Sequence, residues 1–336
     1  MKLDFLAHGR DRAVDFFTHF SPWPPAAALL LPLVVGLLLM PLGIGLLARL
    51  GLGQRVRVGG PDEHHTKEGT PTAGGLIIVA LVLLAVLFVD RRREVVPVLV
   101  AMILGGGLGL VDDIATVRGA TRGLLARQRI VLQGLISLAL AIWFFSMGMD
   151  SQVVPLVGTW HMGWLIVPVA AVALVSAANA FNLTDGSDGL AAGVMVLVAL
   201  VLALIVRNRH DIAQVRLLLA TAGALLAFLV YNLPPARVFM GGVGSEGIGM
   251  LLAAASIAGG LVWFLPLLAL VPAIETLSVI VQVVSFKTRG KRVFKMAPLH
   301  HHFQVSGWGE WTVALAGWAA TSAVGTLGLL LAKRAV

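Results

Sequence analysis

Long runs of apolar residues recur along the chain, separated by shorter polar segments. A helix needs about 20 apolar residues to cross the hydrocarbon core of a bilayer, and ten runs in this chain approach that length. We therefore predict an all-α fold: a polytopic integral membrane protein with about ten transmembrane helices, forming a single membrane-embedded domain over residues 1–336. The expected spans are residues 26–48, 74–89, 95–110, 130–147, 164–181, 190–206, 217–233, 248–263, 264–286 and 311–331.

The segments between these spans alternate between the two sides of the membrane, because each span carries the chain across. Five polar segments are each separated from the next by two spans, and so they lie on the same side. They are residues 51–73, 111–129, 182–189, 234–247 and 287–310. On the opposite side, residues 152–161 have the pattern of a small β-hairpin. A shared face is what a site assembled from loops requires.

Composition agrees with a membrane protein. The 336 residues are 58% hydrophobic and 12% charged, whereas about a quarter of a soluble domain is charged. The absence of cysteine excludes disulfides and thiolate metal sites. In a membrane protein, the net charge of +8 indicates anionic headgroups or anionic substrates rather than nucleic acid. Charges in the first 25 residues do not fit a cleavable signal peptide and suggest a short interfacial helix.

Lysine and arginine are slightly more frequent on the side of the five polar segments, with 13 against 11 on the other side. Because cytoplasmic loops are enriched in these residues, the excess indicates that the five segments face the cytoplasm. The triplet Arg91-Arg92-Arg93 on the other side goes against this orientation.

The third polar segment places ionisable side chains directly after an apolar run. It contains Asp185 and Asp188, three residues apart. An ionisable residue at a membrane segment is a candidate functional residue. If this segment opens a helix, the two carboxylates share one face, and Gly186 lets a ligand approach the backbone. The alternative is that Asp185 is the N-cap of the next helix, a role that needs only one carboxylate.

Two other segments carry groups that suit phosphate chemistry. Asp112 and Asp113 are adjacent at a membrane edge, where two carboxylates repel unless a cation or a proton lies between them. Magnesium is the natural cation when the ligands are oxygens and the substrate is a phosphate. Four arginines follow, which can receive an anionic head group. The first segment combines Lys67 with hydroxyls and glycine amides, a set that suits phosphate, or it is only a solvated basic loop.

The last two polar segments leave alternatives open. A glycine-rich turn follows Phe239 and could hold a nucleotide, or it is only a flexible turn. His300, His301 and His302 are consecutive and would point in different directions on a helix, whereas a zinc site needs spaced ligands. Phosphate contacts or proton handling are therefore favoured. Carboxylates, magnesium and basic residues on one face suit phosphoryl transfer between a soluble nucleotide and a lipid held in the bilayer.

The polar segments and their flanks contain the motifs GPDEHHTKEGTPTAGG, GLVDD, GLLAR, NAFNLTDGSDGLA and LSVIVQVVSFKTRGKRVFKMAPLHHHFQ. With the number of spans, these motifs resemble the bacterial phospho-N-acetylmuramoyl-pentapeptide-transferase family, one of the polyprenyl-phosphate N-acetylhexosamine-1-phosphate transferases. The resemblance covers nearly the whole chain. The triple histidine resembles the muramoyl-pentapeptide branch rather than the N-acetylglucosamine-1-phosphate branch.

The resemblance implies transfer of phospho-MurNAc-pentapeptide from UDP-MurNAc-pentapeptide to undecaprenyl phosphate, giving lipid I and UMP in peptidoglycan synthesis, with Mg²⁺ as cofactor. It also implies a multi-pass protein of the bacterial cytoplasmic membrane, commonly a homodimer, with its active site facing the cytoplasm and no nucleic-acid partner. The alternatives are an N-acetylglucosamine-1-phosphate transferase on the same lipid carrier and a non-catalytic homologue that binds nucleotide or lipid. Five motif segments on one side argue against a transporter, whose polar groups would lie at mid-depth.

The resemblance also implies roles by position. Asp112 corresponds to the residue proposed to deprotonate the lipid phosphate, and Phe239 to the aromatic residue that stacks on uracil. Lys67 belongs to a nucleotide-side loop, and Gln282 faces the sugar or the base. The implied catalytic residues are Asp112, Asp113, Asp185, Asp188 and His301. The implied substrate-binding residues are Lys67, Thr70, Thr72, Asn182, Gly186, Asn232, Phe239, Gln282, His300 and His302.

One departure from the family pattern affects the metal site. The family reads Phe-Met-Gly-Asp-x-Gly-Ser in the fourth segment, and that aspartate is its clearest magnesium ligand, but this chain has Gly242. Because glycine has no side-chain oxygen, the usual magnesium site loses its main charge, and one reading is that Asp185, Asp188 or Asp113 holds the metal instead. Glu246 is another candidate, about one helical turn after Gly242. Otherwise the substitution inactivates or alters the protein, or the chain is a degenerate homologue.

A second departure lies after the paired aspartates. A lysine usual there is Thr116 in this chain, with Arg118 nearby. We therefore expect the fold and substrate pocket of a lipid I synthase, with impaired metal binding unless another carboxylate replaces the missing one.

Overall fold

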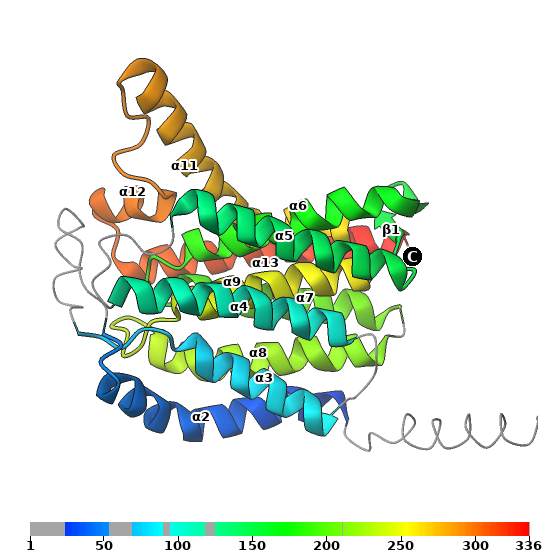
Figure 1. Ribbon diagram of the computed structural model, residues 1–336, viewed down its shortest axis with the longest axis horizontal. Coiled ribbons are helices and arrows are strands. Elements are labelled where there is room, and N and C mark those ends of the chain that lie inside the picture. Colours follow the sequence, from blue (N-terminus) through cyan, green and yellow to red (C-terminus); the bar gives the residue numbers. More distant parts are fainter. Residues whose placement is uncertain (1–23, 54–68, 90–94, 118–124, 210, 336) are drawn as a thin grey trace, which may run out of the picture.

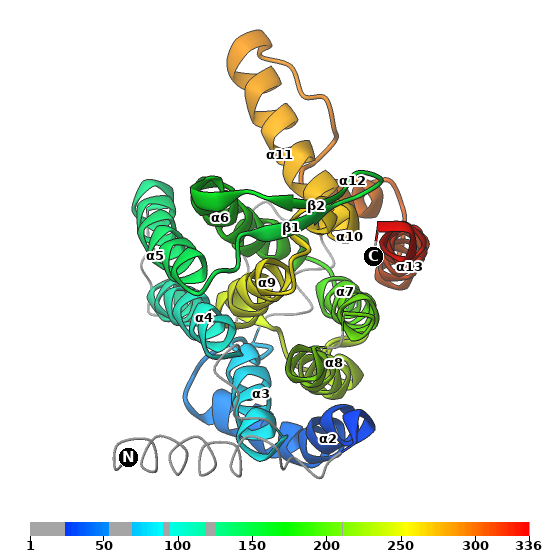
Figure 2. The same cartoon turned by 90° about the vertical axis from the view of Figure 1, so that its right-hand side faces the viewer.

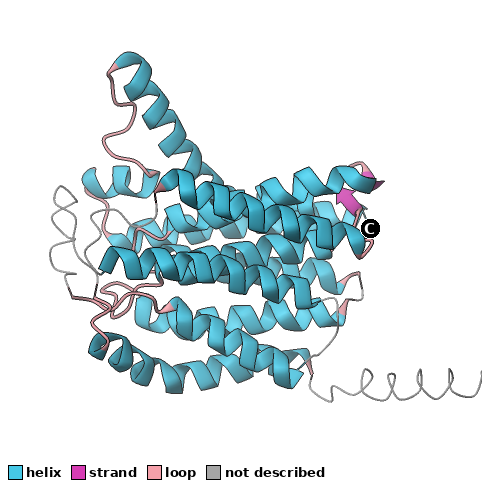
Figure 3. Ribbon diagram, viewed as in Figure 1, coloured by secondary structure: helices cyan, strands magenta, loops and turns pink. Residues whose placement is uncertain are grey.

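The computed structural model describes residues 24–53, 69–89, 95–117, 125–209 and 211–335. Over these ranges the chain forms a bundle of long helices with one small β-hairpin (Figure 1 and Figure 3). In chain order the elements are α2 (Pro25–Arg49), α3 (Gly75–Val89), α4 (Val96–Val117), α5 (Ala126–Ser146), β1 (Ser151–Val154), β2 (Gly158–His161), η3 (Gly163–Leu165), α6 (Ile166–Thr184), α7 (Leu190–Arg207), α8 (Ile212–Asn232), α9 (Gly241–Ala258), η4 (Val262–Phe264), α10 (Leu265–Leu268), α11 (Leu270–Arg289), α12 (Leu299–Val305) and α13 (Glu310–Ala335).

Within the described ranges, nine helices are long and apolar enough to cross a membrane. α3 is also apolar but is shorter, at 15 residues. The expected all-α membrane fold with about ten spans is therefore confirmed. The interfacial helix expected near the N-terminus lies outside the described residues, as does Lys67.

Several helix ends differ from the expected spans. α4 continues to Val117 and α5 begins at Ala126, so both extend into the expected second polar segment. α9 begins at Gly241, and Glu246 therefore lies in a helix rather than in a loop. The expected turn near residues 263–266 is present as η4 and α10, and α11 begins only at Leu270. Tertiary packing extends these helices beyond the apolar pattern, since helix propensity is a weak preference that tertiary context overrides.

α9 is the central helix of the bundle. All of its residues from Gly242 to Ile257 are buried, and α3, α4, α6, α7 and α8 surround it (Figure 2). The approach of α4 is so close that a Cβ atom on Gly109 would lie 2.2 Å from the carbonyl carbon of Gly242. Small residues allow two helix backbones to approach in this way. This packing outweighs the low helix propensity of the glycines in α9.

The hairpin lies at the end of the bundle opposite α12 (Figure 1). Its strands pair Ser151 with His161 and Val154 with Gly158, which confirms the hairpin expected at residues 152–161. At the other end, α11 leans away from the remaining helices (Figure 1). In α11, Glu275 is among the few buried residues, so most of this helix is available to lipid or to a bound molecule.

Candidate active site

The polar segments meet at the end of the bundle that carries α12. The backbone N–H of Phe239 donates to the carbonyl of Pro71 at 2.8 Å, which joins the fourth segment to the first. The Gln304 amide donates to the hydroxyl of Ser187 at 3.3 Å, which joins the fifth segment to the third. The second segment joins the fourth through Asp113. These contacts bring the five segments together on one face, as the spacing of the spans predicts.

Asp113 binds the N-terminus of α9. Its Oδ1 accepts a hydrogen bond from the N–H of Gly242 at 2.9 Å, and its Oδ2 accepts one from Val243 at 3.1 Å. A helix N-terminus offers unsatisfied N–H groups and partial positive charge, which stabilise a carboxylate. Gly241 has a φ of 71°, and a Cβ there would lie 2.6 Å from Asp113 Oδ2. The glycine-rich turn therefore holds one of the chain's own carboxylates.

Asp185 and Asp188 lie in the turn between α6 and α7. The expectation that this segment opens a helix is wrong, because α7 begins only after Gly189, whose φ of 75° is left-handed. The alternative that Asp185 is the N-cap of α7 is also wrong, because Gly189 occupies that position. Asp188 is buried, and its Oδ2 accepts a hydrogen bond from the N–H of Ala236 at 2.8 Å. Asp188 thus fixes the third segment against the fourth.

The pKa of the Asp185 carboxyl is raised well above its usual range. Burial is the largest cause, followed by the negative charges of Asp113 and then Asp188, while the N–H of Gly241 acts in the opposite direction. Carboxylates from the second and third segments therefore face a common region. Their repulsion is the arrangement that a cation relieves.

Asp112 lies beside Arg129, with 3.6 Å between its Oδ2 and the guanidinium Nη1. The Nη2 of the same guanidinium donates to Glu246. The oxygens of Glu246 also accept hydrogen bonds from Gln133 and Asn182. Glu246 is therefore a member of a buried polar network, and its oxygens are already occupied by donors that a magnesium ion would have to displace.

The three histidines of α12 have different surroundings, as consecutive positions on a helix should. His300 is buried. The Nδ1 of His301 lies 2.8 Å from Gln304 Oε1, and the Nδ1 of His302 accepts a hydrogen bond from the N–H of Lys295 at 3.2 Å. The rings of His301 and His302 are thus held by partners within the fifth segment.

Gly186 brings the histidines and the third segment together. A Cβ atom on Gly186 would lie 2.3 Å from Nε2 of His300 and 3.4 Å from Nε2 of His301. On its other side, His300 Nδ1 lies 3.2 Å from Glu275 Oε2, and the Glu275 carboxylate also accepts the N–H of His300 at 3.1 Å. Glu275 thereby fixes the position of the His300 ring beside the backbone of Gly186.

Two of the expected substrate-binding residues, Asn232 and Gln282, form hydrogen bonds to the backbone of polar segments. Asn232 accepts a hydrogen bond from Gly189 at 3.1 Å and donates to the carbonyl of Val238 at 2.9 Å. Gln282, on α11, donates to the carbonyl of Phe294 at 2.9 Å and accepts from the same residue's N–H at 3.0 Å. Gln282 therefore fixes the loop that follows α11, and its hydrogen bonds do not join it to the four aspartates.

The first segment reaches the site through Thr72, whose Oγ1 would lie 3.1 Å from a Cβ on Gly241. Thr70 and Phe239 are half-buried at the same end of the bundle. Sequence reasoning did not single out Glu275 or Gln133, although a polar residue within an apolar run is the signal that could have identified both.

The carboxylates fit a magnesium ion that is completed by a substrate. Within the described ranges, no group of three or more His, Cys, Asp and Glu side chains is arranged to hold a metal ion. Magnesium, however, usually binds one or two carboxylates together with substrate phosphates and water. Asp185 and Asp188 are the candidates for such a pair. Burial is the largest cause of the raised pKa of Asp185, but the negative charges of Asp113 and Asp188 add to it, and these charges favour a cation. Gly242 supplies only its backbone N–H to this region.

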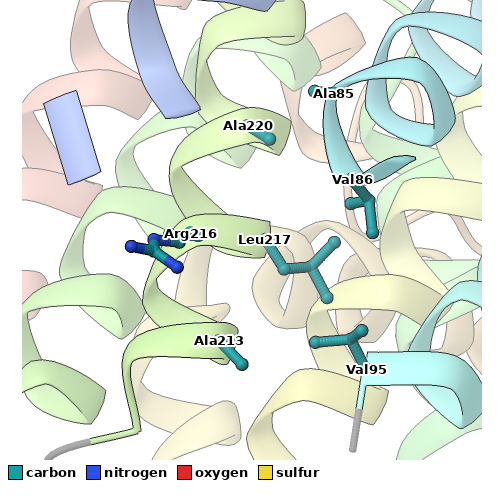
Figure 4. A pocket seen from close by; sticks show the side chains of 7 residues that line it. All are labelled: Ala85, Val86, Val95, Ala213, Arg216, Leu217 and Ala220. Atoms are coloured by element: carbon teal, nitrogen blue, oxygen red, sulfur yellow. The ribbon is translucent and has the colours of Figure 1, made fainter. Parts of the chain in front are cut away.

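Two sizeable cavities lie along α11. One, of about 800 Å³, is apolar and lies between α6 and α10–α11, with Asn179 in its wall. The other, of about 680 Å³, lies between α11 and the loop before α12, and Lys287, Arg292 and Lys295 line it. At the opposite end of the bundle, residues of α3 and α8, including Arg216, line a space together with Val95. This space has no room for a water molecule (Figure 4).

Comparison with known proteins identifies the family. Residues 95–260 match the family described as glycosyl transferase family 4. The phospho-N-acetylmuramoyl-pentapeptide-transferase of Halalkalibacterium halodurans is 40% identical over 316 residues, covering 92% of this chain and 95% of that protein. Proteins of the same name from Moorella thermoacetica and Bacillus subtilis are 41% and 37% identical, each over 311 residues that cover 90% of this chain and 97% and 96% of theirs. The chain therefore belongs to the phospho-N-acetylmuramoyl-pentapeptide-transferase family of membrane transferases.

Proposed function

We propose that the protein transfers phospho-MurNAc-pentapeptide from UDP-MurNAc-pentapeptide to undecaprenyl phosphate, forming lipid I and releasing UMP. The observation that carries this proposal is the meeting of aspartates from two polar segments with the histidines of α12 at one end of a membrane bundle. The name and coverage of the relatives support the choice of substrates. This end faces the cytoplasm of a bacterial cell, and the protein works as a homodimer.

In the proposed reaction, an oxygen of undecaprenyl phosphate attacks the phosphorus attached to the sugar, and the bond from that phosphorus to the UMP oxygen breaks. Asp112 accepts the proton of the lipid phosphate, and Asp113 holds the adjacent helix N-terminus in place. Asp185 and Asp188 would hold Mg²⁺, which supplies positive charge to the diphosphate when bound. His301 contacts a phosphate or handles a proton.

The remaining residues bind the two substrates. Phe239 stacks on uracil. The apolar cavity beside α6 and α11 suits the isoprenoid chain, because it is about 800 Å³ in volume and Asn179 in its wall is one helical turn before Asn182. The nucleotide and sugar contacts are Lys67, Thr70, Thr72, Asn182, Gly186, Asn232, Gln282, His300 and His302.

The proposal is tested with the purified full chain in lipid vesicles. Supplied with UDP-MurNAc-pentapeptide, undecaprenyl phosphate and Mg²⁺, it should form lipid I and UMP at a low rate, and a chelator should stop the reaction. Asp112→Asn should remove the remaining activity. Conversion of UDP-GlcNAc in place of the muramoyl substrate would support the N-acetylglucosamine-1-phosphate alternative.

The Gly242 position favours a second candidate, a homologue that binds its ligands without turnover. Gly242 contributes no side-chain oxygen, and its N–H is already used by Asp113. Binding of UMP and polyprenyl phosphate without lipid I formation, both in the natural chain and in Gly242→Asp, would support this candidate over the transferase.

A further inference from the structure

Glu246 is a carboxylate with no exposed surface, placed in the wall of the site. Its exposed fraction is 0%. Burying a carboxylate is unfavourable unless the charge is paired and its oxygens are hydrogen-bonded. Both conditions hold, because Oε1 accepts from Arg129 and from Asn182 at 3.1 Å, and Oε2 accepts from Gln133 at 2.8 Å. Asn179 in turn donates to Gln133 at 2.6 Å. The network thereby ties α5 and α6 to the first turns of α9.

The guanidinium of Arg129 lies between two carboxylates of unequal burial. Asp112 is 3.6 Å away with 25% of its side chain exposed, whereas the Glu246 side chain is fully buried and directly bonded. Because water screens an ion pair, the attraction is stronger in the less exposed position. Glu246 therefore balances the larger part of the Arg129 charge. Arg129 consequently compensates less of the negative charge of Asp112.

Glu246 also determines the orientation of the Asn182 side-chain amide, that is, which of its two polar atoms faces the carboxylate. An ionised carboxylate can only accept hydrogen bonds, so the Nδ2 group of Asn182 must face Glu246. Its carbonyl oxygen is then directed away from Glu246. Asn182 lies three residues before Asp185, so an acceptor is fixed near the carboxylates. An acceptor suits a cation or a substrate N–H or O–H group, and it does not suit a phosphate oxygen.

We propose that Glu246 is a positioning residue of the phosphate-transfer site, a role that rests on the proposed function. Glu246 balances part of the charge of Arg129 and holds its guanidinium away from a closer contact with Asp112 and with the phosphate of the lipid substrate. Without the Glu246 charge, Arg129 is paired only with Asp112, and the site carries one more unit of positive charge. A polyprenyl phosphate then binds more tightly, whereas the existing ion pair of Asp112 with Arg129 becomes closer and transfer becomes slower.

The experiment compares the natural full chain in detergent with Glu246→Gln, Arg129→Gln and the double variant. Two measurements need no turnover: the affinities for UMP and for a short-chain polyprenyl phosphate. In Glu246→Gln we expect polyprenyl phosphate to bind about 3- to 10-fold more tightly and UMP affinity to stay within about twofold. Where transfer is measurable, KM for the polyprenyl phosphate should fall together with kcat. In the double variant, phosphate affinity should return to within about twofold of the natural chain, because the added positive charge is gone.

Gln152 offers a matched control at the other end of α9. It is buried, donates to the carbonyl of Ile257 at 3.0 Å and accepts from the N–H of Val262 at 3.0 Å. Gln152→Leu should therefore lower the thermal midpoint Tm without changing either affinity. A parallel loss of both affinities and of Tm in Glu246→Gln, or an unchanged phosphate affinity, would overturn the positioning role.

The same measurements separate this inference from the proposed function. A natural chain that binds both ligands but forms no lipid I, even as Gly242→Asp, argues against the proposed transfer, and the affinities still decide the role of Glu246. A chain that binds neither ligand overturns both.

Discussion

Because Gly186 has no side chain, the rings of His300 and His301 can lie close to the backbone of the third polar segment. A methyl group at this position would lie 2.3 Å from His300 Nε2. The ring cannot move aside easily, since it is buried and lies against Glu275. At this scale, the absence of one side chain decides whether His300 and His301 can lie beside the backbone of Gly186.

Gly186→Ala should accordingly displace His300 and lower the transfer rate by about tenfold or more, because a displacement of about 1 Å at a site of this kind is costly. Gly134→Ala is the matched control, since a Cβ on Gly134 meets no atom within 4 Å. Rates of lipid I formation and Tm values should be measured for both. Equal rates for the two variants would refute the account of the histidines.

Gly242 is the second position where one side chain decides the chemistry. Gly242→Asp should raise the rate of lipid I formation by orders of magnitude, because it adds the oxygen ligand that the metal site lacks. The new Cβ would lie 3.1 Å from the Cα of Gly109 and 3.3 Å from Asp113 Oδ1, so some loss of stability is expected.

Gly242→Ala separates these two effects, since it adds the same Cβ without an oxygen. It should share the loss of Tm and gain no activity. Full magnesium-dependent activity of the chain with glycine at position 242 would contradict this account of the metal site.

At the scale of elements, the contact between α4 and α9 aligns the site. Asp113 reaches the N–H groups of α9 only because the two helices touch through glycine backbones. A Cβ on Gly109 would lie 2.2 Å from the carbonyl carbon and oxygen of Gly242. The close approach of two backbones is therefore a requirement of the Asp113 geometry.

Gly109→Ala should separate the two helices, lower Tm by several degrees and reduce transfer, because the clash involves backbone atoms that cannot rotate away. Gly107→Ala, on the same helix, has no atom within 4 Å of the new Cβ. It should be neutral or slightly stabilising, because alanine favours a helix more than glycine does. If the Tm of Gly109→Ala equals that of Gly107→Ala, the backbones of α4 and α9 do not pack as closely as the structure indicates.

At the scale of the whole molecule, the orientation in the membrane can be tested directly because the chain has no cysteine. Val157 in the hairpin and Lys291 after α11 are both exposed and lie at opposite ends of the bundle. In intact cells, a membrane-impermeant maleimide should label Val157→Cys, whereas Lys291→Cys should be labelled only after the cells are opened. The reverse pattern would place the aspartates outside the cytoplasm.

The homodimer is the other prediction at this scale. α2, α5, α11 and α13 each carry several exposed apolar side chains, which lipid or a second copy must cover in a membrane. Native mass spectrometry from mild detergent should show two chains per particle. A monomer that retains full transfer activity would contradict the expected dimer.

The number of spans, the hairpin and the shared face of the polar segments could be predicted from the sequence. In hydrocarbon each span must satisfy its own backbone hydrogen bonds, so a local apolar pattern is enough to identify a helix. The aspartates could be identified as candidates for the same reason, since an ionisable residue at a membrane edge is costly. The spacing of the spans then determined that these residues share one side.

Only the tertiary structure decided which of these groups touch. Asp113 meets Gly242 across 129 positions of the chain, and Gln133 meets Glu246 across 113. A pattern of apolar and polar residues within one segment cannot predict a contact between residues so far apart in the sequence. Asp185 was expected in a helix and lies in a turn, because Gly189 takes a left-handed conformation after α6 has ended. Apolar spacing therefore determined the membrane fold, whereas the packing of glycine backbones between α4 and α9 decided how the site is assembled.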